Sequence, residues 1–114
     1  MKYNNKKTQV DMYVFDSALE AKRYKQLVLL EKAGEIKNLE TQVKFELQEA
    51  FRKNKKYFRS ITYIADFMYF DNRTGQTVVE DTKGMKTDVF KIKQKLFEYK
   101  YPNLSLKIVT KEEI

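Results

Sequence analysis

The first apolar repeat along the chain predicts a helix over residues 17–33. Apolar side chains recur there every three or four positions, which is the spacing of one helical face, as in Ala21, Tyr24, Leu27 and Val28. Ser17 stands at the start of this repeat and Glu20 follows three positions later, a pattern typical of a capping box. Gly34 suits the positive φ with which many helices end.

Three strands are predicted next, between residues 35 and 83. Val43, Phe45 and Leu47 alternate with polar residues, and this period of two indicates a half-buried strand. Residues 60–70 are rich in β-branched and aromatic types, and residues 76–83 form a third strand of the same kind. Only a short turn separates these two strands, so we expect them to form a hairpin. The basic stretch between the first two strands is expected to be a turn or loop, residues 52–59.

The end of the chain predicts a second helix and a closing strand. Residues 86–102 show helical periodicity, and Pro102 stops the helix. Its apolar face is expected to consist of Val89, Ile92, Leu96 and either Tyr99 or Phe97. Residues 104–110 form a short strand, and a helix that connects two strands favours a parallel pair.

The predicted order of elements is therefore α-β-β-β-α-β, an α/β fold with a mixed central sheet flanked by helices. A chain of 114 residues fits one domain. We place this domain at residues 13–114. Residues 1–12 are polar and basic, and we expect a flexible basic arm that is either disordered or lies along DNA.

The amino-acid composition narrows the chemistry. The chain has no Cys and no His, which excludes disulfides, thiol nucleophiles, imidazole bases and the usual zinc ligands. A bound metal would need oxygen ligands, a set that favours Mg²⁺ or Mn²⁺. The net charge of +7 makes nucleic acid the first candidate partner, with an anionic membrane surface second and mere solubility as the plain alternative.

Targeting signals are missing from the sequence. No run approaches the roughly 18 apolar residues of a membrane-spanning helix. The basic start MKYNNKKTQV lacks the apolar segment of a signal peptide. We therefore expect a cytoplasmic protein with no membrane partner.

The most informative residues are two acids and a lysine on the predicted hairpin. Asp81 and Lys83 are two apart and so share one face of their strand, and Asp66 lies on the preceding strand among apolar residues. A carboxylate in such a strand is costly unless it is paired or binds a metal. Two carboxylates and one lysine meet the needs of metal-assisted phosphodiester hydrolysis. The alternative is that they form structural salt bridges with Lys83.

These residues carry a resemblance to a known family. TYIADFMYF at 62–70, followed by VVEDTKG at 78–84, resembles the PD-(D/E)XK nuclease superfamily, with Ala65 in place of the motif's proline. The opening FDSALEAKRY at 15–24 and the predicted order of elements add to it. The chain looks like a compact phage-encoded branch, similar to Holliday-junction resolvases and to the endonuclease subunit of a bacterial transposase. The fold implied is a restriction-endonuclease-like core.

The resemblance also implies roles for single residues. Asp66, Asp81, the carbonyl of Thr82 and Glu20 would be metal ligands, and Lys83 would be the catalytic lysine. Glu20 is also explained by the capping box, and the two roles are compatible. Glu80 points to the other side of its strand, but a bulge would let it exchange roles with Asp81. Gln42, on the first strand, is a weaker candidate for indirect contact with the site.

Basic residues are candidates for nucleic-acid binding in two places. The first is the basic stretch that contains Tyr57 and Phe58, with Arg52, Lys53, Lys55, Lys56 and Arg59. The second is the helix after Gly84, with Lys86, Lys91 and Lys95. In both places the alternative is a solvated basic surface.

The function expected from the sequence is a Mg²⁺-dependent (or Mn²⁺-dependent) endodeoxyribonuclease. We expect it to select branched or recombination intermediates in the manner of a Holliday-junction resolvase and to act as a homodimer, because cutting two strands needs two sites. A phage or prophage origin in a bacterial host follows from the resemblance alone. One alternative is a non-catalytic basic nucleic-acid-binding module on the same fold. Another is a ribosomal-type or protein-interaction domain whose acidic residues are only salt-bridged.

Overall fold

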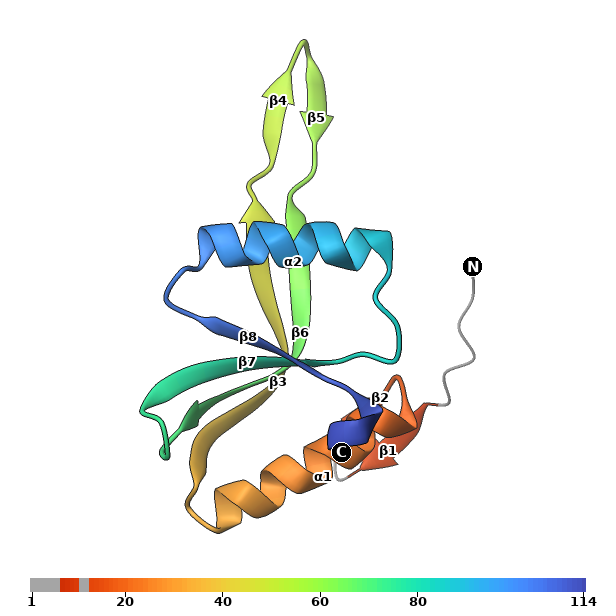
Figure 1. Ribbon diagram of the computed structural model, residues 1–114. Coiled ribbons are helices and arrows are strands. Elements are labelled where there is room, and N and C mark those ends of the chain that lie inside the picture. The colour runs from red at the N-terminus through yellow and green to blue at the C-terminus, as the bar shows by residue number, and fades with distance from the viewer. Residues whose placement is uncertain (1–6, 11–12) are drawn as a thin grey trace.

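The computed structural model describes residues 7–10 and 13–114 (Figure 1). The elements follow one another as β1 (Thr8–Val10), β2 (Tyr13–Phe15), α1 (Ala18–Lys32), β3 (Ile36–Gln48), β4 (Phe51–Lys53), β5 (Lys56–Phe58), β6 (Ile61–Asp71), β7 (Gln76–Thr82), α2 (Asp88–Lys100), β8 (Ser105–Val109) and the short 3₁₀ helix η1 (Lys111–Glu113). In the described part of the chain, neither helix has the length and apolarity required to cross a membrane.

A mixed four-stranded sheet forms the centre of the protein. The strand order is β3-β6-β7-β8, with antiparallel pairs up to β7 and a parallel pair between β7 and β8. The crossover through α2 makes this last pair parallel, as the sequence predicted. Helices α1 and α2 lie on opposite faces of the sheet (Figure 1). The predicted α-β-β-β-α-β order is confirmed for α1, β3, β6, β7, α2 and β8.

Each face of the sheet has its own hydrophobic core. The core under α1 is formed by Phe15, Ala21, Tyr24, Leu27, Ile36, Phe67 and Tyr69. The core under α2 is formed by Phe45, Leu47, Tyr63, Ala65, Val79, Phe90 and Phe97. Aromatic rings fill much of both cores, and their edge-on and tilted contacts suit the ring quadrupole.

The two long strands change the face that they bury halfway along their length. Ala65 belongs to the core under α2 and Phe67 to the core under α1, although residues two apart normally share a face. On β3, Val43 pairs with Ala65 and Thr41 pairs with Phe67. Gln42, between Thr41 and Val43, has a φ of 53°, a backbone conformation that residues other than glycine rarely adopt. The sheet is therefore irregular at the level of Asp66, where the two cores meet.

A buried ion pair holds α1 against the sheet. The guanidinium of Arg23 donates two hydrogen bonds of 2.8 Å to the carboxylate of Glu80, which is completely buried. The hydroxyl of Tyr69 donates to the same carboxylate. All three side chains come from different elements, so the pair fixes the position of α1 over β6 and β7.

Two predicted segments differ from the structure. Residues 8–10, placed within a flexible arm, form strand β1 paired with β2, while residues 1–6 and 11–12 of that arm lie outside the described residues. The basic stretch 52–59, predicted as a turn or loop, contains the paired strands β4 and β5. Alternation is hard to see there because the residues of both strands are exposed on both sides.

The predicted apolar face of the second helix is only partly right, because it includes Leu96 and Phe97, which pack in the core under α2, but also Val89, Ile92 and Tyr99. Phe90 and Phe97 are the residues of α2 that are buried, whereas Val89 and Ile92 are more than 60% exposed and Tyr99 is 88% exposed. The helix packs on the sheet through its two large phenylalanines. The remaining apolar residues form a second stripe, and periodicity alone could not tell which stripe is buried.

We predict that Arg23→Ala lowers the free energy of unfolding by about 3–5 kcal/mol, because the Glu80 carboxylate stays buried without its cation. Lys100→Ala is the matched control, since Lys100 pairs with Glu46 at the surface at 3.8 Å. Such an exposed pair contributes about 1 kcal/mol or less. Urea unfolding of the three proteins measures both values. Similar losses in the two variants would contradict the role given to Arg23.

Candidate functional site

Asp66 stands where the two cores meet, and strand β7 holds its carboxylate in place. The backbone N–H and the hydroxyl of Thr82 both donate to Oδ2 of Asp66, each at 2.8 Å. The Asp66 side chain is half-buried. Its position is fixed by a neighbouring strand and not by a flexible loop, as a preorganised site requires.

Asp81 lies beside Asp66 and is 2% exposed. Its Oδ2 atom accepts a 2.5 Å hydrogen bond from the hydroxyl of Tyr63 and lies 3.4 Å from Nζ of Lys83. Nζ of Lys83 also lies 4.4 Å from the centre of the Phe90 ring. These contacts hold the lysine ammonium next to the acid, as the sequence predicted for two residues on one face.

Glu20 reaches the same place from the first turn of α1. The cap of α1 is the Ser17 side chain, which accepts a 3.1 Å hydrogen bond from the Glu20 backbone N–H. The carboxyl of Glu20 is 5% exposed and accepts a 3.0 Å hydrogen bond from Nε2 of Gln42. It also shares a hydrogen bond with Asp66. The residue with this unusual backbone conformation, Gln42, is thus the one whose side-chain amide binds the carboxyl of Glu20.

The carboxyl groups of Glu20 and Asp81 both interact with that of Asp66, and the pKa values of Glu20 and Asp81 are raised. Burial, and then hydrogen bonding and repulsion from Asp66, raise the pKa of Glu20 to about 9. The same causes raise the pKa of Asp81 to about 7, although Tyr63 and Lys83 act in the opposite direction. At neutral pH the cluster retains protons that isolated carboxylates would have lost.

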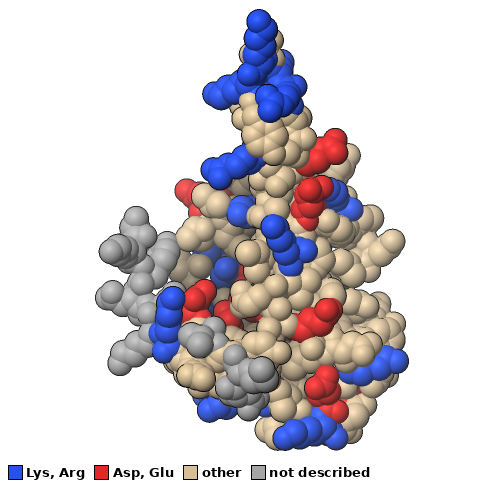
Figure 2. Space-filling model, turned by 180° about the vertical axis from the view of Figure 1, so that it is seen from behind, with Lys and Arg blue, Asp and Glu red and all other residues tan. Residues whose placement is uncertain are grey.

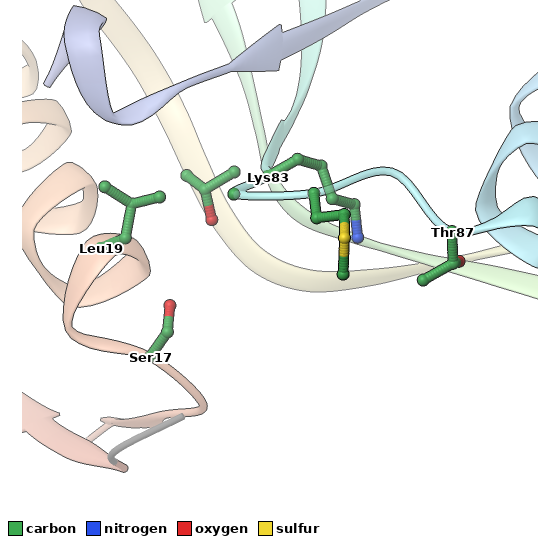
Figure 3. A pocket seen from close by; sticks show the side chains of 7 residues that line it. Ser17, Leu19, Lys83 and Thr87 are labelled. Carbon is green, nitrogen blue, oxygen red and sulfur yellow. The ribbon is translucent and has the colours of Figure 1, made fainter. Parts of the chain in front are cut away.

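An open hollow of about 350 Å³ is lined by Thr82 and Lys83, the two residues that follow Asp81, while none of the three acids lines it. Figure 3 shows Ser17 and Leu19 from the start of α1 on one side, and Lys83 and Thr87 from the segment between β7 and α2 on the other. A second hollow adjoins Lys83 on the side of α2 and includes Lys93. A ligand in these hollows would contact Lys83 directly.

The donor set of the site suits a hard divalent cation. No group of three or more acidic, His or Cys side chains in the described residues is arranged so that it could hold a metal ion as it stands. The three carboxyl groups nevertheless lie together and are partly or wholly buried. Burial, followed by hydrogen bonding to and repulsion from Asp66, raises the pKa of both Glu20 and Asp81. A cation that replaced the protons would relieve this repulsion, and oxygen ligands are those that Mg²⁺ and Mn²⁺ prefer.

The structure brings together Asp66, Asp81, Glu20 and Lys83, as predicted. Two other candidates, Thr82 and Glu80, are arranged differently. Thr82 contacts Asp66 through its N–H and hydroxyl, and its carbonyl as a metal ligand stays a prediction. Glu80 faces α1 and is engaged by Arg23 and Tyr69, so it does not exchange roles with Asp81.

The predicted nucleic-acid-binding residues are exposed but lie outside the hollows. Those of the basic stretch, Lys53, Lys55, Lys56 and Arg59, lie on or next to β4 and β5. Those of the second group, Lys86, Lys91 and Lys95, lie on α2 or on the segment before it. None of the seven lines the two hollows beside Lys83.

Two residues of the site were missed from the sequence. Tyr63 was not among the predicted site residues, yet its hydroxyl donates a hydrogen bond to Asp81. Burial, with the nearby acids, raises the pKa of Tyr63 far above the ordinary value. Lys93 was not preferred among the helix lysines, although it alone of them lines a hollow beside Lys83. The sequence held no signal for Tyr63, because residues three apart on a strand normally lie on opposite faces.

A family model described as "Protein of unknown function (DUF1064)" matches residues 1–113. The chain belongs to this family. No curated protein and no solved structure matched the chain.

We predict that, in EDTA, the wild-type protein becomes less stable as the pH rises from about 5 to 9. The raised pKa of Glu20 means that the folded protein binds a proton that the unfolded chain releases above its ordinary pKa of 4.5. The stabilisation is complete below that value and is lost as the pH approaches 9. Urea unfolding at pH 5, 7 and 9 measures the slope.

The variant Glu20→Gln should have a flatter profile, because its amide does not titrate, and should be more stable than the wild type at pH 9. Glu98→Gln, at an exposed position of α2, is the control and should follow the wild type. Parallel profiles for wild type and Glu20→Gln would show that no proton is held at this site.

Proposed function

We propose that this protein is a Mg²⁺-dependent or Mn²⁺-dependent endodeoxyribonuclease with Asp66, Asp81, Glu20 and Lys83 at its active site. The observation that carries the proposal is the cluster of three carboxyl groups beside Lys83, in which Glu20 and Asp81 have raised pKa values, together with the open hollow that Lys83 lines. Groups with strongly perturbed pKa values that converge in a hollow are typical of functional sites.

The carboxylates supply the ligands that this chemistry needs. Asp66 and Asp81, from the sheet, and Glu20, from α1, would hold the cation. A divalent cation there would polarise the scissile phosphate and lower the pKa of a water molecule. Thr82 keeps Asp66 oriented through two hydrogen bonds, Tyr63 does the same for Asp81, and Gln42 does so for Glu20. Every acid thus has a neighbour that fixes its orientation.

Lys83 supplies a positive charge beside the three acids. Its ammonium lies between Asp81 and the face of Phe90, and its side chain is 28% exposed. From this position it can reach a phosphate oxygen in the hollow and stabilise the negative charge that develops on it during hydrolysis. Lys93 lies on the same side and would add a second cation to the phosphate contact.

DNA is the proposed substrate, and the fold supports this choice. The order of elements and the acidic centre on β6 and β7 agree with a restriction-endonuclease-like core, which remains part of the proposal. The net charge of +7 favours a polyanion. Preference for branched DNA and action as a homodimer, with one site for each strand, complete the proposal.

The test is cleavage of labelled four-way junction, flap, single-stranded and linear duplex DNA in Mg²⁺, Mn²⁺ or EDTA. We expect cutting in either metal, none in EDTA, and a loss of at least about 100-fold in Asp81→Asn or Lys83→Ala. Asp71→Asn is the control, because Asp71 pairs with Arg73 at the far end of β6.

The outcomes separate the alternatives. Binding of DNA without cutting in either metal would favour the non-catalytic binding module. A wild type that neither binds nor cuts would return the acids to a structural role. Cutting that survives in Asp81→Asn would assign the activity to other residues.

A further inference from the structure

Strands β4 and β5 form a ribbon that projects from the body of the protein. The ribbon, residues 51–58, continues β3 and β6 beyond the sheet, as Figure 1 shows. Each residue of both strands is exposed. A two-stranded ribbon with no core behind it is marginally stable in water, so its conformation needs contacts of its own.

Aromatic and cation–π contacts supply that support. The rings of Phe51 and Phe58 are stacked, with centres 4.8 Å apart and an angle of 10° between their planes. Arg52 lies over the ring of Tyr57 at 5.4 Å, and Lys56 lies over that of Phe58 at 5.2 Å. The ribbon is thus a preformed element that buries no apolar core, which points to a role outside the fold.

Positive charge covers the ribbon on both sides. Residues 51–59 include five Lys or Arg and no acid, and Figure 2 shows basic side chains gathered at this end of the molecule. Residues that pair directly across a ribbon share a side. Lys53 and Lys56 therefore lie on one side and Arg52 lies with Tyr57 on the other, with Lys55 in the turn. A ribbon that is basic on both sides is better suited to binding in a groove with negative charge on both sides than to binding on one flat negative surface.

We propose that the β4–β5 ribbon lies in the major groove of duplex DNA and contacts phosphates of both strands. The major groove of B-DNA is about 12 Å wide and admits a two-stranded ribbon, and its walls are the two phosphate backbones. This inference rests on the proposed function, since it takes DNA as the substrate, and adds where and in what form that DNA is held.

The position of the ribbon sets the length of DNA that the protein needs. Strand β6 leads from the ribbon to Asp66, and at about 3.3 Å per residue the chain between Phe58 and Asp66 spans at most about 26 Å. From Lys55 in the turn the span is at most about 36 Å. At about 3.4 Å per base pair the ribbon contacts the groove at most about 8–11 base pairs from the cleaved phosphate, which is within roughly one helical turn.

The test compares binding by the wild type and by a ribbon variant, Lys53→Gln with Lys55→Gln and Lys56→Gln. The control variant removes the same charge from exposed positions of α1, Lys22→Gln with Lys25→Gln and Lys32→Gln. Fluorescence anisotropy in EDTA measures affinity for a 30-base-pair DNA duplex, the same duplex as RNA, and one DNA strand. Thermal unfolding of each variant confirms that it is folded.

The ribbon variant should bind duplex DNA at least about tenfold more weakly than the control variant, with the salt slope reduced by about three. Its affinity for duplex RNA should match that of the control variant, because the major groove of RNA is too narrow for a ribbon. Equal losses on both duplexes, a larger loss on single-stranded DNA, or no loss beyond that of the control would each overturn the inference.

A second readout locates the contact. Dimethyl sulfate methylates guanine N7, which faces the major groove. The wild type should protect guanines in the groove beside the bound active site, out to at most about 8–11 base pairs from it, while the ribbon variant should not. Protection confined to the site itself would also overturn the inference. Because binding is measured in EDTA, a protein that uses the ribbon but never cuts DNA would overturn the proposed nuclease and leave this inference standing.

Discussion

The main constraint on this structure is the repulsion among three clustered carboxyl groups, of which two are buried and one is half-buried. Glu20, Asp66 and Asp81 come from three different elements, and the fold forces them together in surroundings that disfavour charge. Protons relieve the repulsion in the absence of a cation, and a divalent cation would relieve it better. A site with no such role would more simply be filled with apolar side chains, because buried like charges lower stability.

The rest of the fold resists this repulsion. The irregular backbone at Gln42 lies where the sheet changes from packing under α1 to packing under α2. Glu20 can therefore approach from α1, while Asp81 accepts a hydrogen bond from Tyr63 of the core under α2. The buried pair of Arg23 with Glu80, one turn along α1 from Glu20, fixes the helix to the sheet. Stability and the geometry of the site therefore depend on the same contacts.

Sequence alone predicted the elements that local patterns define. The alternation around Phe45 and the short turn before β7 gave the strands, and the spacing of Asp81 and Lys83 placed both on one face. The buried stripe of α2 was predicted only in part, because two apolar stripes compete. Phe97, left as an alternative to Tyr99, packs against the rings of the core, and Phe90 was missed. Gln42 and Glu20 are 22 positions apart, and their contact depends on the irregular backbone at Gln42. No local sequence pattern reveals such a contact.

The most direct measurement is calorimetric titration of Mn²⁺ at pH 7 in buffers of different ionisation enthalpy, which counts the protons released on binding. The account predicts one Mn²⁺ per chain and the release of about one to two protons, because the cation replaces the protons held by Glu20 and Asp81. Asp66→Asn should abolish the binding. Absence of Mn²⁺ binding in the wild type, or binding that releases no protons and survives in Asp66→Asn, would contradict the account.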